Sequence, residues 1–404
     1  MPTETHIDYR AQNISALADY YAAGCKQKKL LGLELEHFVV DKQTRRSLTY
    51  DNGVAQILTR LLPLYGGAPI LSQGQIIGIM KEGAPITLEP AAQLEISIGP
   101  CHKIAEIAQI YNAFTAIITP ILDDMGCELV CVGYHPKSKV DELPLIPKQR
   151  YEYMDAHFKS TGTRGKNMMK GSGATQVSID YENETDFSKK FRVANILGPL
   201  LSLICDNTPV FEGEPFKGRM ARTFIWNDVD PARSMVVKGA LDGEFGFYEY
   251  AKYIYDLPSV LMIEDGEAIF TGPKPVSELF AKRTMILEDM IHASTMAFPD
   301  VCLKTHIEIR MADSMSIEYA LAYVALLQGI FYNSSNLDKL YQMTLGIGNS
   351  QVMEAKAKLM EKGADAEVYG KRGANWIAEL FQIAENGLNA DEIEYLKPLK
   401  EKKI

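Results

Sequence analysis

Four separate segments of this chain alternate apolar and polar side chains, and the polar positions are mostly acidic or amide. In a β-strand, successive side chains point to opposite faces, so residues two apart share a face. Glutamate is depleted from strands, yet it dominates these polar faces. Segment by segment, the polar faces hold Glu34 with Glu36; Gln93 with Glu95, and Glu89 at the same parity upstream; Gln176 with Ser178 and Asp180; and His306 with Glu308 and Arg310.

An ordinary antiparallel sheet with one solvated face would give the same alternation on any single strand. If the four segments are neighbours, however, several carboxylates crowd one surface. Two unit charges about 4 Å apart repel by roughly 4 kcal/mol at an effective dielectric of 20, so a positive group must offset the repulsion. Carboxylate and amide oxygens without clustered Cys or His suit the hard cations Mg²⁺ or Mn²⁺. The joint pattern therefore predicts a divalent-metal site on the polar face.

The remaining pattern predicts an α+β fold with a mainly antiparallel sheet. Strand runs and helical runs do not alternate strictly, which favours a sheet covered on one side by helices. Besides the acidic segments (30–40, 92–98, 174–180 and 303–310), strands are predicted at 75–81, 127–132 and 260–263. Helices are predicted at 8–26, at 52–64 with Asp51 or Asn52 as N-cap, and at 102–125, 186–205, 243–255 and most of 314–404.

Composition argues against several classes of function. The formal net charge is −10 and no basic stripe is present, so no nucleic-acid partner is expected. No segment is expected to reach the roughly 20 apolar residues that span a bilayer, and the polar N-terminus lacks a signal-peptide pattern. A cytoplasmic protein without membrane association is therefore expected. The six cysteines fit neither a disulfide scaffold nor a zinc site, which favours reduced thiols.

Basic and aromatic side chains complete the predicted site. Arg150, Arg222 and Arg310 lie beside polar loops or strand ends, and arginine forms bidentate pairs with carboxylate or phosphate. A structural salt bridge is the alternative for each of them. Trp226 follows Arg222 by four residues and would either wall a small-molecule pocket or lie in the core. The chain has no P-loop and no Rossmann glycine motif, so metals and basic side chains would hold any ATP phosphates.

Six ordered blocks of the sequence resemble the plant and proteobacterial type of glutamate–cysteine ligase. Gly32–Phe38 is similar to the Gly-x-Glu-x-Glu-x-Phe opening of that family, and Leu88–Ser97 to its Leu-Glu-Pro-Gly-Gly-Gln-Phe-Glu-Leu-Ser. Ile146–Tyr151 resembles Met-Pro-Lys-Gly-Arg-Tyr, Thr175–Asp180 resembles Val-Gln-Val-Asn-Leu-Asp, and Arg222–Trp226 resembles Arg-Ser-His-Ile-Trp. Leu303–Asp313 resembles Leu-Lys followed by Leu-Glu-Met-Arg and Ala-Asp, and the resemblance spans roughly residues 30 to 390.

The resemblance implies a glutamine-synthetase-like fold, in which the concave face of a curved antiparallel sheet holds ATP and Mg²⁺. It implies one catalytic domain over residues 1–404, with 314–404 as its helical C-terminal part. The implied enzyme is a monomer or homodimer that joins glutamate to cysteine through a γ-glutamyl phosphate intermediate, the first step of glutathione synthesis. ADP and phosphate are the other products.

The resemblance also implies a role for each matching residue. The metal ligands would be Glu34, Glu36, Glu89, Glu95 and Glu308, and Gln93, Gln176 and Arg310 would bind the nucleotide. Arg150, Arg222 and Trp226 would hold glutamate, whereas Arg310 and Lys304 would face the transferred phosphate as catalytic groups. No cysteine needs a catalytic role.

Three positions depart from the family pattern and keep other functions open. Ala91 and Ala92 replace two glycines, which restricts how closely the backbone there approaches a ligand. Ser178 stands where the family has asparagine. A γ-glutamyl ligase for a different amine or amino-acid acceptor is therefore the first alternative. A non-catalytic nucleotide- or amino-acid-binding protein is the second.

Overall fold

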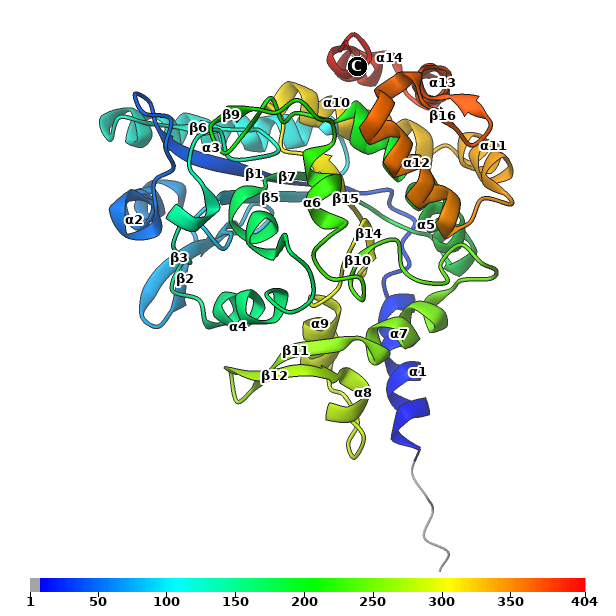
Figure 1. The fold of residues 1–404 in the computed structure, drawn as a ribbon, viewed down its shortest axis with the longest axis horizontal. Helices are drawn as coiled ribbons and strands as arrows, with labels where there is room; N and C mark the ends of the chain where they lie inside the picture. The colour runs from blue at the N-terminus through cyan, green and yellow to red at the C-terminus, as the bar shows by residue number, and fades with distance from the viewer. Residues whose placement is uncertain (1–7, 404) are drawn as a thin grey trace, which may run out of the picture.

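A computed structural model describes residues 8–403, which are built around one nine-stranded antiparallel sheet (Figure 1). The strand order is β14-β15-β7-β1-β5-β4-β3-β2, and β6 pairs with the far end of β1. All pairings in this sheet are antiparallel, as the sequence predicts. The strands are β1 Leu31–Asp41, β2 Ala68–Ser72, β3 Gln75–Met80, β4 Ile86–Leu88, β5 Leu94–Cys101, β6 Cys127–Val130, β7 Ala174–Ile179, β14 Val301–Leu303 and β15 Ile307–Asp313.

The four acidic segments are neighbours in this sheet. Strand β1 lies between β5 and β7, and β15 pairs with the other side of β7. In the register, Glu36 faces Glu95 directly, and Glu34 lies between Ser97 and Gln176. Residues directly opposite in an antiparallel pair share a face. The predicted convergence of the polar faces onto one surface is therefore confirmed.

Helices cover the apolar face of the sheet in two layers. The inner helices contact the strands, and the outer helices pack mainly on α10 and α5. Because α10 has neighbours on both sides, it is apolar nearly all round. The inner layer is α2 Ala55–Tyr65, α3 Ile104–Asp124, α5 Glu184–Ile204 and α10 Ile317–Phe331, and the outer layer is α11 Ser334–Thr344, α12 Asn349–Lys362, α13 Gly373–Asn386 and α14 Ala390–Lys400.

The polar face is also covered in part by α6, which lies in front of the sheet in Figure 1, and α4 lies below it; both helices line one cavity. A group of smaller elements extends below them: the β11–β12 hairpin, α1, α7, α8 and α9. The remaining bounds are α1 Tyr9–Ala22, α4 Gln149–Phe158, α6 Ala221–Trp226, α7 Phe247–Asp256, α8 Val276–Leu279, α9 Leu287–Ser294, β8 Val210–Phe211, β9 Glu214–Pro215, β10 Ser234–Met235, β11 Pro258–Glu264, β12 Glu267–Pro275, β13 Phe298–Pro299, β16 Glu367–Val368 and β17 Lys371–Arg372.

The prediction of one continuous strand at 303–310 is wrong, because β14 ends at Leu303 and β15 begins at Ile307. The chain turns between β14 and β15, where the amide of Lys304 donates to the carbonyl of His306 at 2.8 Å. His306 therefore lies in the turn and does not extend the row of Glu308 and Arg310. The turn has a consequence for the site, because it folds Lys304 back onto Glu308.

The N-cap predicted at Asp51 or Asn52 is also wrong. The helical segment begins two residues earlier than predicted, at Tyr50, with Thr49 as its N-cap. The Thr49 hydroxyl accepts from the Asn52 amide at 3.3 Å, and the Asn52 side chain accepts from the Thr49 amide at 2.6 Å. This reciprocal pair satisfies two free N–H groups at the helix start.

The expectation that no segment is apolar over the length needed to span a bilayer is wrong for helix α3. Over 21 residues it is long and apolar enough to cross a membrane, by length and composition alone. In this fold its apolar side, including Phe114 and Ile118, packs against α2, α10 and the sheet.

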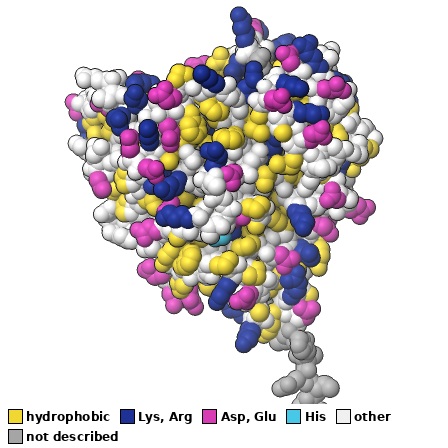
Figure 2. All heavy atoms as spheres, viewed as in Figure 1, with side chains coloured by type: hydrophobic (Ala, Val, Ile, Leu, Met, Phe, Trp, Pro, Cys, Tyr) yellow, Lys and Arg dark blue, Asp and Glu magenta, His cyan; other side chains and the backbone are white. Residues whose placement is uncertain are grey.

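On the face of the molecule shown in Figure 2, basic and acidic side chains are intermixed.

Candidate active site

The centre of the polar face is a row of carboxylates from separate strands. Glu34 and Glu36 come from β1, Glu95 from β5 and Glu308 from β15. Glu36 and Glu95 are 9% exposed and Glu308 is fully buried. Glu89 joins them from the β4–β5 turn, where its amide donates to the carbonyl of Gln93 at 2.9 Å. The structure thus brings together all five predicted acidic residues.

Burial and mutual repulsion disfavour the charged form of most of these groups. Burial raises the pKa of Glu34 to about 8, with repulsion from Glu308 and Glu95 adding to it. Burial and the charge of Glu89 raise the pKa of Glu95 to about 7, and the pKa of Glu36 is raised well above its ordinary value for the same reasons. The row is therefore short of positive charge, as expected for carboxylates that bind a cation.

Glu308 is the exception, because it already has two cationic partners. Burial alone would raise its pKa, but the ammonium of Lys304 and the guanidinium of Arg310 hold that pKa well below its ordinary value. Lys304 and Arg310 therefore lie at the carboxylate row, as predicted. In the structure, both cations are paired with Glu308.

Gln176 contributes an oxygen that lacks a partner. Its amide nitrogen donates to Glu36 at 3.3 Å, whereas its buried Oε1 has no hydrogen-bond partner. A buried oxygen without a donor fits a cation or a ligand donor. Within residues 8–403, no three acidic, His or Cys side chains are already arranged to hold a metal ion. The carboxylates would therefore have to close around an ion.

A cavity of about 80 Å³ adjoins the row at the Glu36 and Glu89 end. Arg222 and Trp226 of α6 line it, and both carry a buried N–H without a hydrogen-bond partner, Nε of Arg222 and Nε1 of Trp226. Apolar side chains also line it, among them Met168. Unpaired donors beside an apolar wall suit a small ligand with a carboxylate and an uncharged part.

A second cavity of about 350 Å³ opens at the Glu34 end of the row. Its lining includes the hydroxyl residues Ser97 and Ser178, together with Lys26 and His306. Burial lowers the pKa of His306 to about 4, so this imidazole is neutral at pH 7. The carboxylate row thus separates a small cavity from a larger one.

Two predicted site residues have other contacts. Arg150 donates to Thr295 twice, at 3.0 Å to its hydroxyl and 2.8 Å to its carbonyl, and it does not line the small cavity. Gln93 accepts from the Ala91 amide at 2.9 Å and donates to the carbonyls of Met169 and Ser172 at 3.2 Å. Its amide therefore holds the β4–β5 turn in place.

Lys148 is a residue that the sequence pattern did not single out. Its ammonium is the cation that most lowers the pKa of Glu89, against the larger effect of burial. It also lies 4.7 Å from the centre of the Tyr151 ring, so it is held at the edge of the small cavity. It sits in a loop just before α4, where neither strand nor helix periodicity marks a functional position.

The β4–β5 turn keeps a glycine-type backbone although it contains two alanines. Ala92 has a φ of +67°, in the left-handed region, and its amide donates to the Glu89 carbonyl at 2.9 Å. For an L-residue this conformation costs roughly 1–2 kcal/mol. The turn thus places Glu89 at the row in spite of that strain.

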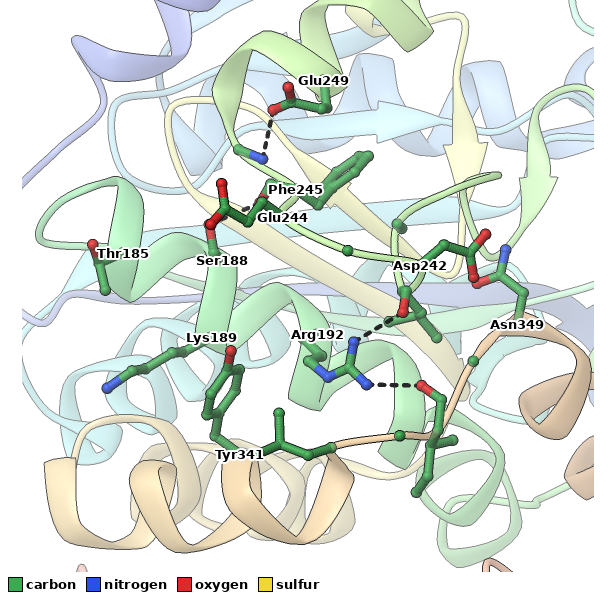
Figure 3. A pocket seen from close by; sticks show the side chains of 18 of the residues that line it. Thr185, Ser188, Lys189, Arg192, Asp242, Glu244, Phe245, Glu249, Tyr341 and Asn349 are labelled. Carbon is green, nitrogen blue, oxygen red and sulfur yellow. Dashed lines mark hydrogen bonds between the residues drawn. The ribbon is translucent and has the colours of Figure 1, made fainter.

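A larger groove, with a volume of about 1400 Å³, lies elsewhere, on the outer side of α5 (Figure 3). Its central cation, Arg192, donates to three backbone carbonyls, those of Leu241, Thr344 and Ile347, at 2.8–3.1 Å. Arg192 therefore joins two loops, and the groove contains none of the predicted site residues. The carboxylate row with its two cavities is the better candidate.

The chain matches a known protein family over most of its length. The family model described as glutamate-cysteine ligase family 2 (GCS2) matches residues 30–401. The chain is 28% identical over 381 residues to the chloroplastic glutamate–cysteine ligase B of Oryza sativa subsp. japonica, covering 92% of this chain and 77% of that protein. It is also 28% identical over 337 residues to the chloroplastic glutamate–cysteine ligase of Arabidopsis thaliana, covering 81% and 64%.

A solved structure supports the fold. The crystal structure of the glutamate–cysteine ligase of Francisella tularensis, in complex with AMP, matches with a TM-score of 0.56 at 12% identity, over 93% of this chain and 82% of that one. The expected glutamine-synthetase-like fold class is confirmed. The expected cytoplasmic location is wrong by the same comparisons, because the plant relatives are named as chloroplastic enzymes.

Proposed function

Because this chain belongs to glutamate-cysteine ligase family 2, we propose that its carboxylate row, Arg222 and Trp226 carry out the reaction of that family. The protein is an ATP-dependent ligase that forms γ-glutamylcysteine from glutamate and cysteine for glutathione synthesis. The observation that supports this assignment of the site is the row of buried and half-buried carboxylates between two cavities of unequal size.

Mg²⁺, or Mn²⁺ in its place, fits the donors of the row. Glu34, Glu36, Glu89, Glu95 and Glu308 supply carboxylate oxygens, and Gln176 supplies an amide oxygen that has no partner. When bound, the metal would neutralise phosphate charge and orient the phosphates. Burial, and to a lesser extent mutual repulsion, raise the pKa values of Glu34 and Glu95, and a bound metal would offset that repulsion.

The two cavities suit the two anionic substrates. The larger cavity, at Glu34, has room for the nucleoside part of ATP, with its phosphates over the row. The smaller cavity would hold glutamate, with a carboxylate on the free donors of Arg222 and Trp226 and the γ-carboxylate toward the row. Arg150 would contribute from the edge, after giving up its bonds to Thr295.

The chemistry requires positioning and charge stabilisation, without a covalent protein nucleophile. An oxygen of the γ-carboxylate attacks the γ-phosphorus of ATP, the bond to the ADP oxygen breaks, and γ-glutamyl phosphate forms. The cysteine amine then attacks the acyl carbon, loses a proton and expels phosphate. Lys304 and Arg310 would stabilise the transferred phosphoryl group, since phosphate oxygens can replace Glu308 as their partners.

An acceptor panel tests this proposal directly. Phosphate release is measured with ATP, Mg²⁺ and glutamate, and with cysteine or other amines as the acceptor. We expect phosphate release only when all four components are present, and the fastest release with cysteine. Faster release with another amine would make that amine the acceptor, and no release with any acceptor would leave a binding protein.

Replacing Trp226 with phenylalanine is expected to raise the KM for glutamate about three- to tenfold, since a hydrogen bond to the substrate contributes about 0.5–1.5 kcal/mol. The indole N–H has no partner in the free protein, so the substitution removes no hydrogen bond there. The KM for ATP should stay within about twofold. Steady-state kinetics with each substrate varied would check this, and equal increases in both KM values would contradict it.

The melting temperature of the metal-free protein is expected to fall as pH rises from about 4.5, the ordinary pKa of a glutamate carboxyl, to about 8, and to level off above that. A carboxyl group whose pKa is raised by folding stabilises the folded state fully only below its unfolded pKa, and this stability is lost as pH rises through the folded pKa. The relevant folded values are about 7 for Glu95 and about 8 for Glu34. Mg²⁺ should reverse the fall. Thermal melts with and without Mg²⁺ measure this, and a flat profile in both would contradict it.

A further inference from the structure

The guanidinium of Arg222 is buried but has few partners. It is 5% exposed, and its Nε has no hydrogen-bond partner. Its Nη2 donates a long hydrogen bond of 3.4 Å to the Arg310 carbonyl. Its ion-pair partner is Asp313, with Oδ1 3.9 Å from Nε. This separation is too long for a hydrogen bond. Arg222 therefore has a counter-ion nearby and keeps its donors free.

Asp313 is prevented from moving closer to Arg222. It lies at the end of β15, is 3% exposed, and its Oδ2 accepts from the Asn207 amide at 2.7 Å and from the Thr208 hydroxyl at 2.8 Å. These two bonds fix one carboxylate oxygen and leave Oδ1 facing Arg222. Gly133 leaves room for this arrangement, because a Cβ at that position would lie 2.1 Å from Oδ2 of Asp313.

We propose that Asp313 is a positioning residue for Arg222: a tethered counter-ion that balances the buried guanidinium while leaving its N–H groups free for the carboxylate of glutamate. This inference rests on the proposed role of Arg222 in glutamate binding. An untethered aspartate would close onto the guanidinium as a hydrogen-bonded pair, and the pair would compete with the substrate. Glu36 lines the same cavity and also attracts the guanidinium, so without Asp313 the guanidinium would turn to Glu36.

The substitution Asp313→Asn tests the counter-ion. The KM for glutamate is expected to rise about tenfold, with kcat and the KM for ATP within about twofold. A merely structural role would lower kcat and alter both KM values together. If Asp313→Asn binds glutamate as well as the wild type or better, the inference is wrong.

The substitution Thr208→Val tests the tether while keeping the charge. Loss of one hydrogen bond of about 1 kcal/mol should raise the KM for glutamate about three- to fivefold. Thr44→Val is a matched control, because its hydroxyl also donates to an aspartate, Asp41, at 2.8 Å, but in an exposed turn. Equal KM values for glutamate in Thr208→Val and Thr44→Val would overturn the tether, even if Asp313→Asn fails to fold.

The wild-type reaction separates this inference from the proposed function. If the wild type releases no phosphate with glutamate and cysteine, the function fails. If the wild type is active and both variants match it, only the role of Asp313 fails.

Discussion

The substitution Glu34→Gln is expected to lower kcat by roughly 10²–10³-fold and, at the same time, to stabilise the metal-free protein. The loss of activity follows because one charged group of the proposed phosphate and metal site is removed, and such groups contribute about this much to catalysis. The gain in stability follows because the pKa of Glu34 is raised to about 8 by burial and by its acidic neighbours. At about pH 7 to 8.5 the wild type must keep this group protonated or bury its charge, whereas glutamine carries no such penalty.

Opposite effects on activity and stability make this variant informative. The metal-free melting temperature and the rate of phosphate release are measured on the same preparation. Glu267→Gln is the matched control, because Glu267 is an exposed strand residue of β12, far in sequence from the row. A Glu34→Gln protein that is less stable than the wild type would show that its loss of activity comes from misfolding. Full activity would remove Glu34 from the site.

The substitution Arg222→Lys is expected to raise the KM for glutamate about 10- to 150-fold. A hydrogen bond to a charged group contributes about 1.5–3 kcal/mol, and lysine cannot reproduce the planar pair of donors that arginine offers a carboxylate. The KM for ATP should change little, because Arg222 lines the small cavity and not the one at Glu34. Initial rates over a glutamate series at saturating ATP provide the measurement.

Arg60→Lys serves as the control for this change. Arg60 forms a 2.8 Å ion pair with Asp124 at the surface of α2, so its replacement should leave both KM values unaltered. An Arg222→Lys enzyme with a normal KM for glutamate would place the amino acid elsewhere. A raised KM for ATP alone would exchange the roles of the two cavities.

Much of the sheet and its acidic face could be predicted from the sequence, because strand periodicity is a local property. The alternation around Glu34, Glu95, Gln176 and Glu308 determines which side chains share a face, and the register then makes them neighbours. The pattern could not show that Lys304 folds back onto Glu308. That contact depends on a tight turn, which interrupts what reads as one alternating segment.

The missed residues are those whose role depends on tertiary contacts. Asp313 lies in an apolar stretch at the end of β15, and only the positions of Asn207 and Thr208 show that its carboxylate is fixed. Lys148 lies in a loop, where charge patterns carry little structural information. Arg150 was predicted from its position beside a polar loop and from the resemblance, and the structure gives it a partner, Thr295, that no local pattern indicates.

Whether the carboxylate row binds metal and nucleotide together can be seen in a crystal structure with Mg²⁺ and a non-hydrolysable ATP analogue. We expect Mg²⁺ ions at about 2.0–2.1 Å from carboxylate oxygens of Glu34, Glu36 and Glu95. The phosphates should lie beside Lys304 and Arg310. Nucleotide bound instead in the groove around Arg192, with no ion among these carboxylates, would contradict the account.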